Sequence, residues 1–231
     1  MRREILDRLM SAGSSRVAMA LVTRLRDGHQ ALVEAACVRG DLELGEPLAG
    51  AVRGLLGREF CGHLPQDQGL FVRVYAGPLR LLIVGAGPIA RTLAPMAALA
   101  GFEVTVIDPR PQFAGDGPCP GASFLADTPQ QAMAQLAPDD RTAVVTLSHD
   151  PAIDDPALMA ALRSPAFYIG ALASARTHGR RLARLAELGL GEQAARIFSP
   201  VGLPLGGRSP AEIAVATLAQ IVQQRHRGAQ T

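Results

Sequence analysis

The chain has 231 residues, of which 48% are hydrophobic and 19% are charged, so it can form the core of one or two folded domains. Its 23 basic and 21 acidic residues give a formal net charge of +2, which is too small to indicate a nucleic-acid partner or a membrane surface. Every basic residue is an arginine, so Schiff-base chemistry and a phosphate-binding lysine are excluded.

The first 77 residues predict a small α+β domain. Residues 1–16 alternate charge and hydrophobicity as an amphipathic helix does, and they lack the apolar core of a signal peptide. Two apolar runs around an Asp-Gly turn at residues 26–29 predict a β-hairpin, and Pro47 opens a helix. The expected elements are strands Val17–Leu25 and Ala31–Val38, helix Leu48–Leu56, a Gly- and Pro-rich loop Gly57–Gly69 and strand Phe71–Tyr75.

Residues 78–231 predict a Rossmann-like α/β domain. Short apolar runs without polar alternation indicate strands covered by helices on both faces, and their alternation with helical patterns predicts a doubly wound parallel sheet. The expected strands are Leu81–Val84, Val104–Ile107, Ser123–Leu125, Ala143–Leu147 and Ala166–Ile169. The expected helices are Ile89–Leu99, Pro129–Leu136, Pro156–Leu162, Arg176–Leu188 and Ser209–Gln224, with a loop from 108 to 121.

A glycine-rich loop follows the first strand of this domain. Gly85 permits a tight turn, and Gly87 lets a phosphate approach the backbone. Ala90 lets the next helix pack closely on the strand, while Pro88 and Ile89 open that helix. The start of a helix presents unpaired N–H groups to an anion, so the loop predicts a nucleotide or phosphate site.

An acidic residue ends the second strand of the domain. Asp108 lies 21 residues after Gly87, at the position where a carboxylate holds a ribose diol in dinucleotide-binding domains. An acid at this position favours a free 2′-hydroxyl, whereas Arg110 keeps a 2′-phosphate open as an alternative.

Two polar clusters follow later strands and are expected at the same sheet edge. His149 and Asp150 come after one strand, and Ser174, Arg176 and His178 come after the next. Asp150 and Ser174 can instead cap helices, and Arg176 and His178 can instead belong to a solvated helix face. The neighbouring arginines at 180, 181 and 184 are interpreted as solvated, and Ser209 as the start of a capping box.

Six segments occur in an order that a known family shares. They are Val84–Gly87, Val104–Phe113, Ser148–Asp150, Tyr168–Ser174, Arg176–His178 and Gly207–Ala214. From about residue 79 to the C-terminus the chain thereby resembles the XdhC/CoxI family of xanthine dehydrogenase accessory proteins. The chain departs from the family's usual Gly-Ala-Gly-His-Val-Gly loop at residues 88–90, and residues 42–47 lack the cysteine of the family's Gly-Gly-Cys segment.

The resemblance implies a molybdenum-cofactor chaperone without turnover chemistry of its own. Such a protein binds molybdopterin, protects the cofactor while its sulfido ligand is installed, and delivers it to an apo-molybdoenzyme of the xanthine dehydrogenase type. A cysteine desulfurase is an additional partner that this role implies. The cofactor-binding residues that the resemblance and the motifs indicate are Gly85, Gly87, Pro88, Ile89, Ala90, Asp108, Arg110, His149, Asp150, Ser174, Arg176 and His178.

The alternative function is an NAD(P)-dependent oxidoreductase that uses the same loop. Without lysine, the proton donor of such an enzyme would be His149, His178 or Tyr168. An exposed sheet edge in the small domain would favour a homodimer.

Cysteine usage and hydropathy favour a cytoplasmic location. Cys37, Cys61 and Cys119 stand far apart, so neither a disulfide framework nor a structural zinc site is expected. Cys61 and His63 supply two metal-binding side chains, which are too few to close a site. No apolar stretch is long enough for a membrane span.

Overall fold

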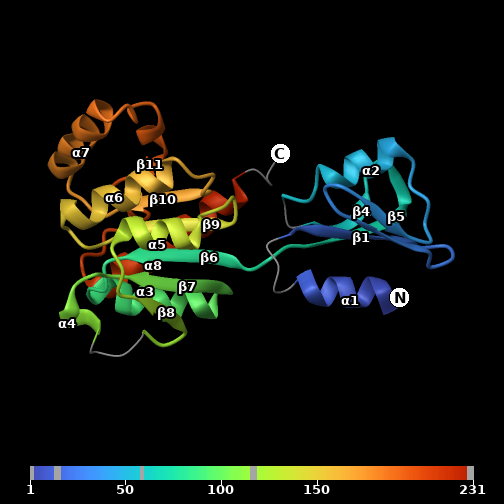
Figure 1. Ribbon diagram of the computed structural model, residues 1–231, viewed down its shortest axis with the longest axis horizontal. Helices are drawn as coiled ribbons and strands as arrows, with labels where there is room; N and C mark the ends of the chain where they lie inside the picture. Colours follow the sequence, from blue (N-terminus) through green and yellow to red (C-terminus); the bar gives the residue numbers. More distant parts are fainter. Residues whose placement is uncertain (1–2, 13–16, 58–59, 115–118, 228–231) are drawn as a thin grey trace. The chain divides into compact units, whose positions relative to one another are not determined.

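The computed structural model describes residues 3–12, 17–57, 60–114 and 119–227. The chain divides into two compact units, residues 1–78 and 79–231 (Figure 1). No helix among the described residues combines the length and the apolar character that crossing a bilayer requires.

The N-terminal unit is a five-stranded antiparallel sheet with the strand order β3-β2-β1-β5-β4. Its helices are α1 (Arg3–Ala12) and α2 (Glu46–Arg53). Its strands are β1 (Met19–Arg24), β2 (Gln30–Val33), β3 (Val38–Gly40), β4 (Cys61–Leu64) and β5 (Asp67–Tyr75). The predicted hairpin is confirmed, since Thr23 pairs with Gln30 and Gly28 adopts the left-handed conformation at the turn, with φ of 75°. Its second expected strand, Ala31–Val38, is instead divided into β2 and β3, which pair with each other.

The prediction of a loop over Gly57–Gly69 is wrong. This segment contains β4 and the first residues of β5, which pair as an antiparallel hairpin. Its glycines and its proline suggest a loop, but Leu64 is buried in the apolar core of the unit and Phe60 packs against that core. Burial of these side chains outweighs the low strand propensity of the segment.

The C-terminal unit is a six-stranded sheet with the order β11-β10-β9-β6-β7-β8, and every pairing in it is parallel. Its strands are β6 (Leu79–Val84), β7 (Phe102–Ile107), β8 (Ala122–Leu125), β9 (Thr142–Thr146), β10 (Tyr168–Ala171) and β11 (Ile197–Phe198). Its α-helices are α3 (Pro88–Leu99), α4 (Pro111–Ala114), α5 (Pro129–Leu136), α6 (Pro151–Leu162), α7 (Ala175–Glu187) and α8 (Pro210–His226). If the strands β6 to β11 are numbered 1 to 6 along the chain, their order across the sheet is 3-2-1-4-5-6. The predicted doubly wound Rossmann-like sheet is therefore confirmed.

Helices cover both faces of this sheet, which explains the uninterrupted apolar strands. Every residue of β6 is buried. Leu81 and Ile83 pack in one cluster with residues of α3 and α8, whereas Leu82 and Val84 pack in another with residues of α5 and α6. Alternate side chains of a strand point to opposite faces, so both clusters need apolar residues from the same strand.

One helix start and two short elements of this unit differ from the sequence predictions. Helix α6 begins at Pro151, five residues before the expected start at Pro156, because Asp150 caps it there. Helix α4 lies in the expected loop after β7, and the short strand β11 was not predicted. Two residues of strand are too few to produce a readable pattern.

Candidate functional site

The loops after β6 and β9 meet at the carboxyl edge of the parallel sheet. These two strands are neighbours, but the chain leaves them toward opposite ends of the sheet, which is the arrangement that opens a crevice at this edge. Gly85 has a φ of 105°, and a Cβ atom added to it would lie 2.6 Å from the backbone nitrogen of Ser148. Only glycine therefore permits this close approach of the two loops.

The start of α3 presents backbone donors at this edge. Gly87 is the N-cap of α3, Pro88 follows it, and the N–H of Arg91 bonds back to the carbonyl of Gly87. A Cβ atom on Gly87 would meet nothing within 4 Å. The side chains of Ile89 and Ala90 are buried, so these residues can contact a ligand only through their backbone N–H groups.

Asp108 lies at the edge but is bonded by the protein itself. Its side chain is 0% exposed, and its Oδ2 accepts a hydrogen bond from the Ala86 N–H at 2.8 Å. Arg110 donates from Nη2 to Oδ2 at 2.7 Å, and from Nε and its backbone N–H to Oδ1. Burial alone would raise the pKa of Asp108, but these hydrogen bonds outweigh it and hold the pKa below its usual range. Its contact with a ribose diol stays a prediction.

The side chain of Arg110 is fixed by contacts with Phe113 as well as with Asp108. Its guanidinium lies over the ring of Phe113 at 4.6 Å from the ring centroid. The bonds to Asp108 and the nearby carboxylates of Asp150 and Asp154 raise the pKa of Arg110 further. The acidic residues that follow β7 and β9 thus lie near one another, as the shared edge requires.

His149 and Asp150 form the loop between β9 and α6. His149 is exposed and has a φ of 63°, a conformation that non-glycine residues adopt infrequently. Asp150 is the N-cap of α6, since its Oδ1 accepts the N–H of Ala152 at 2.9 Å. The structural interpretation of Asp150 is therefore confirmed, and ligand contact by either residue stays a prediction.

The start of α7 carries the second polar cluster. Ser174 caps this helix by accepting the N–H of Thr177 at 3.2 Å, and Arg176 is exposed beside it. His178 is half-buried, and its Nδ1 has no hydrogen-bond partner among the described residues. Burial, and then the positive charge of Arg181, lower the pKa of His178 and so favour its neutral imidazole form.

Arg181 corrects the interpretation of α7 as carrying a solvated arginine face. It is 2% exposed, and it contacts Asp154 through Nη2 at 3.3 Å and Asp155 through Nε at 3.2 Å. Its Nη1 is buried and lacks a partner among the described residues. The helical spacing to buried Leu185, four residues later, places Arg181 on the covered face, which is the signal that sequence reasoning missed.

Asp154 is a buried residue of the edge that sequence reasoning did not single out. It is 0% exposed and accepts the Ser148 hydroxyl at 2.6 Å and the Ser148 N–H at 3.2 Å. Burial raises the pKa of Asp154 despite these bonds and the charge of Arg181. One carboxylate thus joins the loop after β9 to helix α7. Its position in the apolar helix α6, four residues after Asp150, was the available signal.

Tyr168 is not available as a proton donor in this structure. It is 1% exposed, and its hydroxyl donates to Oε1 of Gln220 at 2.6 Å. Burial raises the pKa of Tyr168 far above its usual value. Of the three donors expected for an oxidoreductase, His149, which is exposed, and His178, which is half-buried, are the two that burial does not remove.

The cysteine and histidine of β4 do not converge with other ligands. Cys61 is exposed, and His63 Nδ1 lies 2.8 Å from the carbonyl oxygen of Gln68. Among the described residues, no three side chains of His, Cys, Asp or Glu gather in a group that could hold a metal ion.

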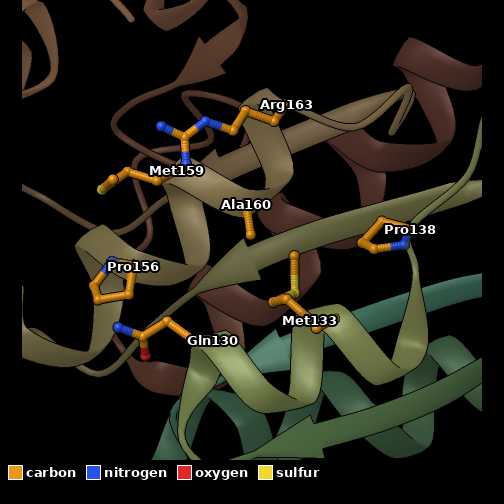
Figure 2. Close-up of a pocket in the computed structure, with 8 residues that line it drawn as sticks. Gln130, Met133, Pro138, Pro156, Met159, Ala160 and Arg163 are labelled. Atoms are coloured by element: carbon orange, nitrogen blue, oxygen red, sulfur yellow. The ribbon is translucent and has the colours of Figure 1, made fainter. Parts of the chain in front are cut away.

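An apolar cavity of about 330 Å³ lies between α5 and α6. Figure 2 shows Met133 and Ala160 pointing toward each other across it, with Arg163 extending alongside Met159. The residues that line it are Gln130, Met133, Ala134, Pro138, Pro156, Met159, Ala160 and Arg163. None of them is a predicted cofactor-binding residue, so the cavity is separate from the crevice at the carboxyl edge.

Comparison with known proteins identifies similar sequences. Residues 81–221 match the family model described as the XdhC Rossmann domain. A probable xanthine dehydrogenase subunit of Bacillus subtilis (strain 168) is 32% identical over 166 residues, which are 71% of this chain and 48% of that protein. The molybdenum cofactor insertion chaperone PaoD of Escherichia coli (strain K12) is 34% identical over 148 residues, which are 64% of this chain and 40% of that protein.

A solved structure extends the similarity to the N-terminal unit. The crystal structure of a xanthine dehydrogenase from Bacillus halodurans aligns with a TM-score of 0.76 and 25% identity, over 99% of this chain and 66% of that one. The chain spans about half or less of the length of the two curated relatives described above.

Proposed function

Because the chain belongs to the XdhC family, we propose that it is a molybdenum-cofactor chaperone, which binds molybdopterin and delivers it to an apo-molybdoenzyme of the xanthine dehydrogenase type. The names of the two curated relatives support this proposal, since one refers to xanthine dehydrogenase and the other to cofactor insertion. A cysteine desulfurase that installs the sulfido ligand and a homodimeric assembly belong to the same proposal.

The observation that carries the proposal is the open approach to the start of α3. A phosphate can reach the backbone at Gly87, because no atom other than those of its chain neighbours lies within 4 Å of where its Cβ would be. The first N–H groups of a helix lack acceptors within the helix and favour an anion, which matches the phosphate of molybdopterin. Arg176 at the start of α7 and the half-buried His178 add polar groups that suit the pterin and the oxo-anionic metal end.

The residues at this edge suit binding and release rather than covalent chemistry. When bound, the cofactor supplies the molybdenum centre that the client enzyme needs. In the chaperone, the α3 N–H groups hold the phosphate through hydrogen bonds that break without a chemical step. The buried links from Asp154 to Ser148 and Arg181 hold the loop after β9 against α7, which keeps the crevice in shape between binding and release.

The oxidoreductase alternative receives less support from the geometry. Its Rossmann strand order suits a dinucleotide. However, the carboxylate expected to hold the ribose, Asp108, is already bonded to Arg110. Tyr168, one of the expected proton donors, is buried with its hydroxyl bonded to Gln220.

Purification from a molybdenum-replete host tests the proposal. We expect the protein to carry a pterin that becomes fluorescent on oxidation, and to show no turnover of NADH or NADPH. Stoichiometric NAD(P) with hydride transfer to a small carbonyl compound, and no pterin, would establish the oxidoreductase instead.

The substitution Gly87→Ala tests the proposed phosphate contact. Gly87 has a φ of −71°, which alanine adopts without strain, so the fold should persist. The added methyl group would keep the phosphate from one of its backbone hydrogen bonds, and we expect the affinity for the pterin to fall by about tenfold, with less pterin retained on purification. Gly50→Ala is the matched control, because it also adds a methyl group in open space but lies in the N-terminal unit. Equal retention by both variants would remove the start of α3 from the binding site.

A further inference from the structure

The pair formed by Asp108 and Arg110 occupies the position where a dinucleotide-binding domain holds a ribose. In such domains the acid after the second strand accepts a hydrogen bond from the ribose 2′-hydroxyl. Here the carboxylate is 0% exposed, and both of its oxygens already accept hydrogen bonds from Arg110. Ala86, in the glycine-rich loop, donates a further bond to Oδ2.

Displacement of the Arg110 side chain from Asp108 by a ribose would be unfavourable. The guanidinium makes a bidentate contact with Asp108 through two charge-assisted hydrogen bonds. Each such bond is about twice as strong as a hydrogen bond between neutral groups. Its flat face also rests on the ring of Phe113 at 4.6 Å. A sugar diol offers neutral donors only, so it cannot recover the energy of the ion pair that it would break.

The remaining part of the crevice does not require a ribose. The α3 N–H groups and the open space at Gly87 recognise a phosphate wherever it is attached. Molybdopterin in its phosphate-monoester form offers that phosphate and has no ribose, whereas its dinucleotide form and NAD(P) carry one beside the phosphates.

We propose that Arg110 closes the ribose subsite through Asp108 and thereby selects a phosphate-monoester pterin over a pterin dinucleotide or NAD(P). This inference rests on the proposed function, because it concerns the ligand of the same crevice. It makes Arg110 a specificity-determining residue, which acts by covering a carboxylate rather than by contacting the pterin.

Two nucleotides that differ only in the diol measure this selection directly. The probes are adenosine 5′-phosphate and its 2′,3′-dideoxy counterpart, titrated by calorimetry into the full chain. We expect the wild-type protein to show no preference between them, because Asp108 is covered. Arg110→Ala uncovers Asp108, so this variant should prefer the diol nucleotide by about tenfold, the effect of a hydrogen bond to a charged group.

Further variants separate this explanation from a general loosening of the site. Asp108→Asn combined with Arg110→Ala should lose the preference, since the uncovered carboxylate is then absent. Arg163→Ala is the control, because it removes an exposed arginine from the α5–α6 cavity and should behave as wild type. Circular dichroism spectra matching wild type would show that each variant is folded.

The outcomes are decisive in either direction. A tenfold preference of the wild-type protein for the diol nucleotide, or for NADP⁺ over NAD⁺, would overturn the inference, as would a folded Arg110→Ala protein that acquires no diol preference. Mass spectrometry of the copurified pterin gives an independent result, for which we expect the form without a nucleotide. A copurified dinucleotide form would refute the inference while leaving the chaperone function intact, and a protein that carries no pterin would refute the proposed function itself.

Discussion

The two units of the chain differ in where they bury charge. In the described part of the N-terminal unit, Glu34 is the charged residue that is buried, and it pairs with Arg8 of α1 at 2.7 Å. In the C-terminal unit, Asp108, Asp154 and Arg181 are buried together at the carboxyl edge of the sheet. Burying a charge is costly unless it is paired, and such pairs gather at functional sites as well as in structural networks, so this edge is a candidate site.

Sheet topology explains this difference. An antiparallel sheet joined by hairpins distributes its loops over both ends, and the N-terminal strands pair in that manner. A parallel sheet brings every loop that follows a strand to the same edge, where polar side chains from distant segments can pair. Arg80, at the opposite edge, is also buried, but its partners all come from one segment, since its guanidinium donates to the carbonyls of Leu136 and Ala137 and pairs with Asp139 at 3.1 Å before β9.

The largest expected effect comes from removing the buried arginine of the C-terminal unit. Arg181→Ala would leave Asp154 buried without its cation, and breaking a buried pair in this way costs about 3 kcal/mol or more. That loss corresponds to a fall of roughly 6–12 °C in the Tm of a domain of this size, measured by calorimetry. Arg180→Ala, on the exposed side of the same helix, should change Tm little. Equal effects of the two variants would mean that the Arg181 pairing contributes nothing to the stability of the unit.

A smaller effect is expected from the contact between the loops after β6 and β9. Gly85→Ala combines a strained φ of 105° with a clash against the backbone of Ser148, so we expect a loss of about 2–3 kcal/mol. Gly101→Ala is the matched control, because Gly101 also has a positive φ, 89°, but open space around its Cβ. The difference between the two variants in the free energy of unfolding, measured by chemical denaturation, gives the contribution of the close approach of the loops. No difference would show that this approach can relax without cost.

The smallest effect distinguishes the two units by pH. The pKa of Asp154 is raised by burial, so its contribution to stability decreases as the pH rises from about 4 toward the raised pKa. The pKa of Glu34 is lowered mainly by the hydrogen bond from Arg8, so its contribution is present above about pH 4.3 and is lost as the pH falls through the lowered pKa.

Calorimetry between about pH 7 and about pH 3 measures these opposite dependences, because this range includes the pH below about 4.3 at which the contribution of Glu34 is lost. On acidification, the wild-type protein should gain stability relative to Asp154→Asn and lose stability relative to Glu34→Gln. Slopes of the same sign for both comparisons would contradict the assignment of the two carboxylates.

Much of the fold and of the carboxyl edge of the parallel sheet could be predicted from short stretches of the sequence. The apolar run before Gly85 and the small residues at positions 87 and 90 follow from backbone geometry within a few residues. The caps at Asp150 and Ser174 are local in the same sense, because each bonds to an N–H two or three residues away. The loop predicted over residues 57–69 failed because its residues form a hairpin that depends on a core built by other strands.

The sequence by itself determined the parallel sheet, the phosphate-type loop and the order in which polar residues follow the strands, since these depend on short-range periodicity and turn chemistry. Tertiary structure alone decided which of those polar residues are covered. Arg181 is buried because Asp154 and Asp155, 27 and 26 residues earlier in the chain, lie against it. Asp108 is covered because Arg110 folds back onto it beside the loop that contains Ala86. The desolvation and pairing of a long polar side chain depend on partners that no local pattern specifies.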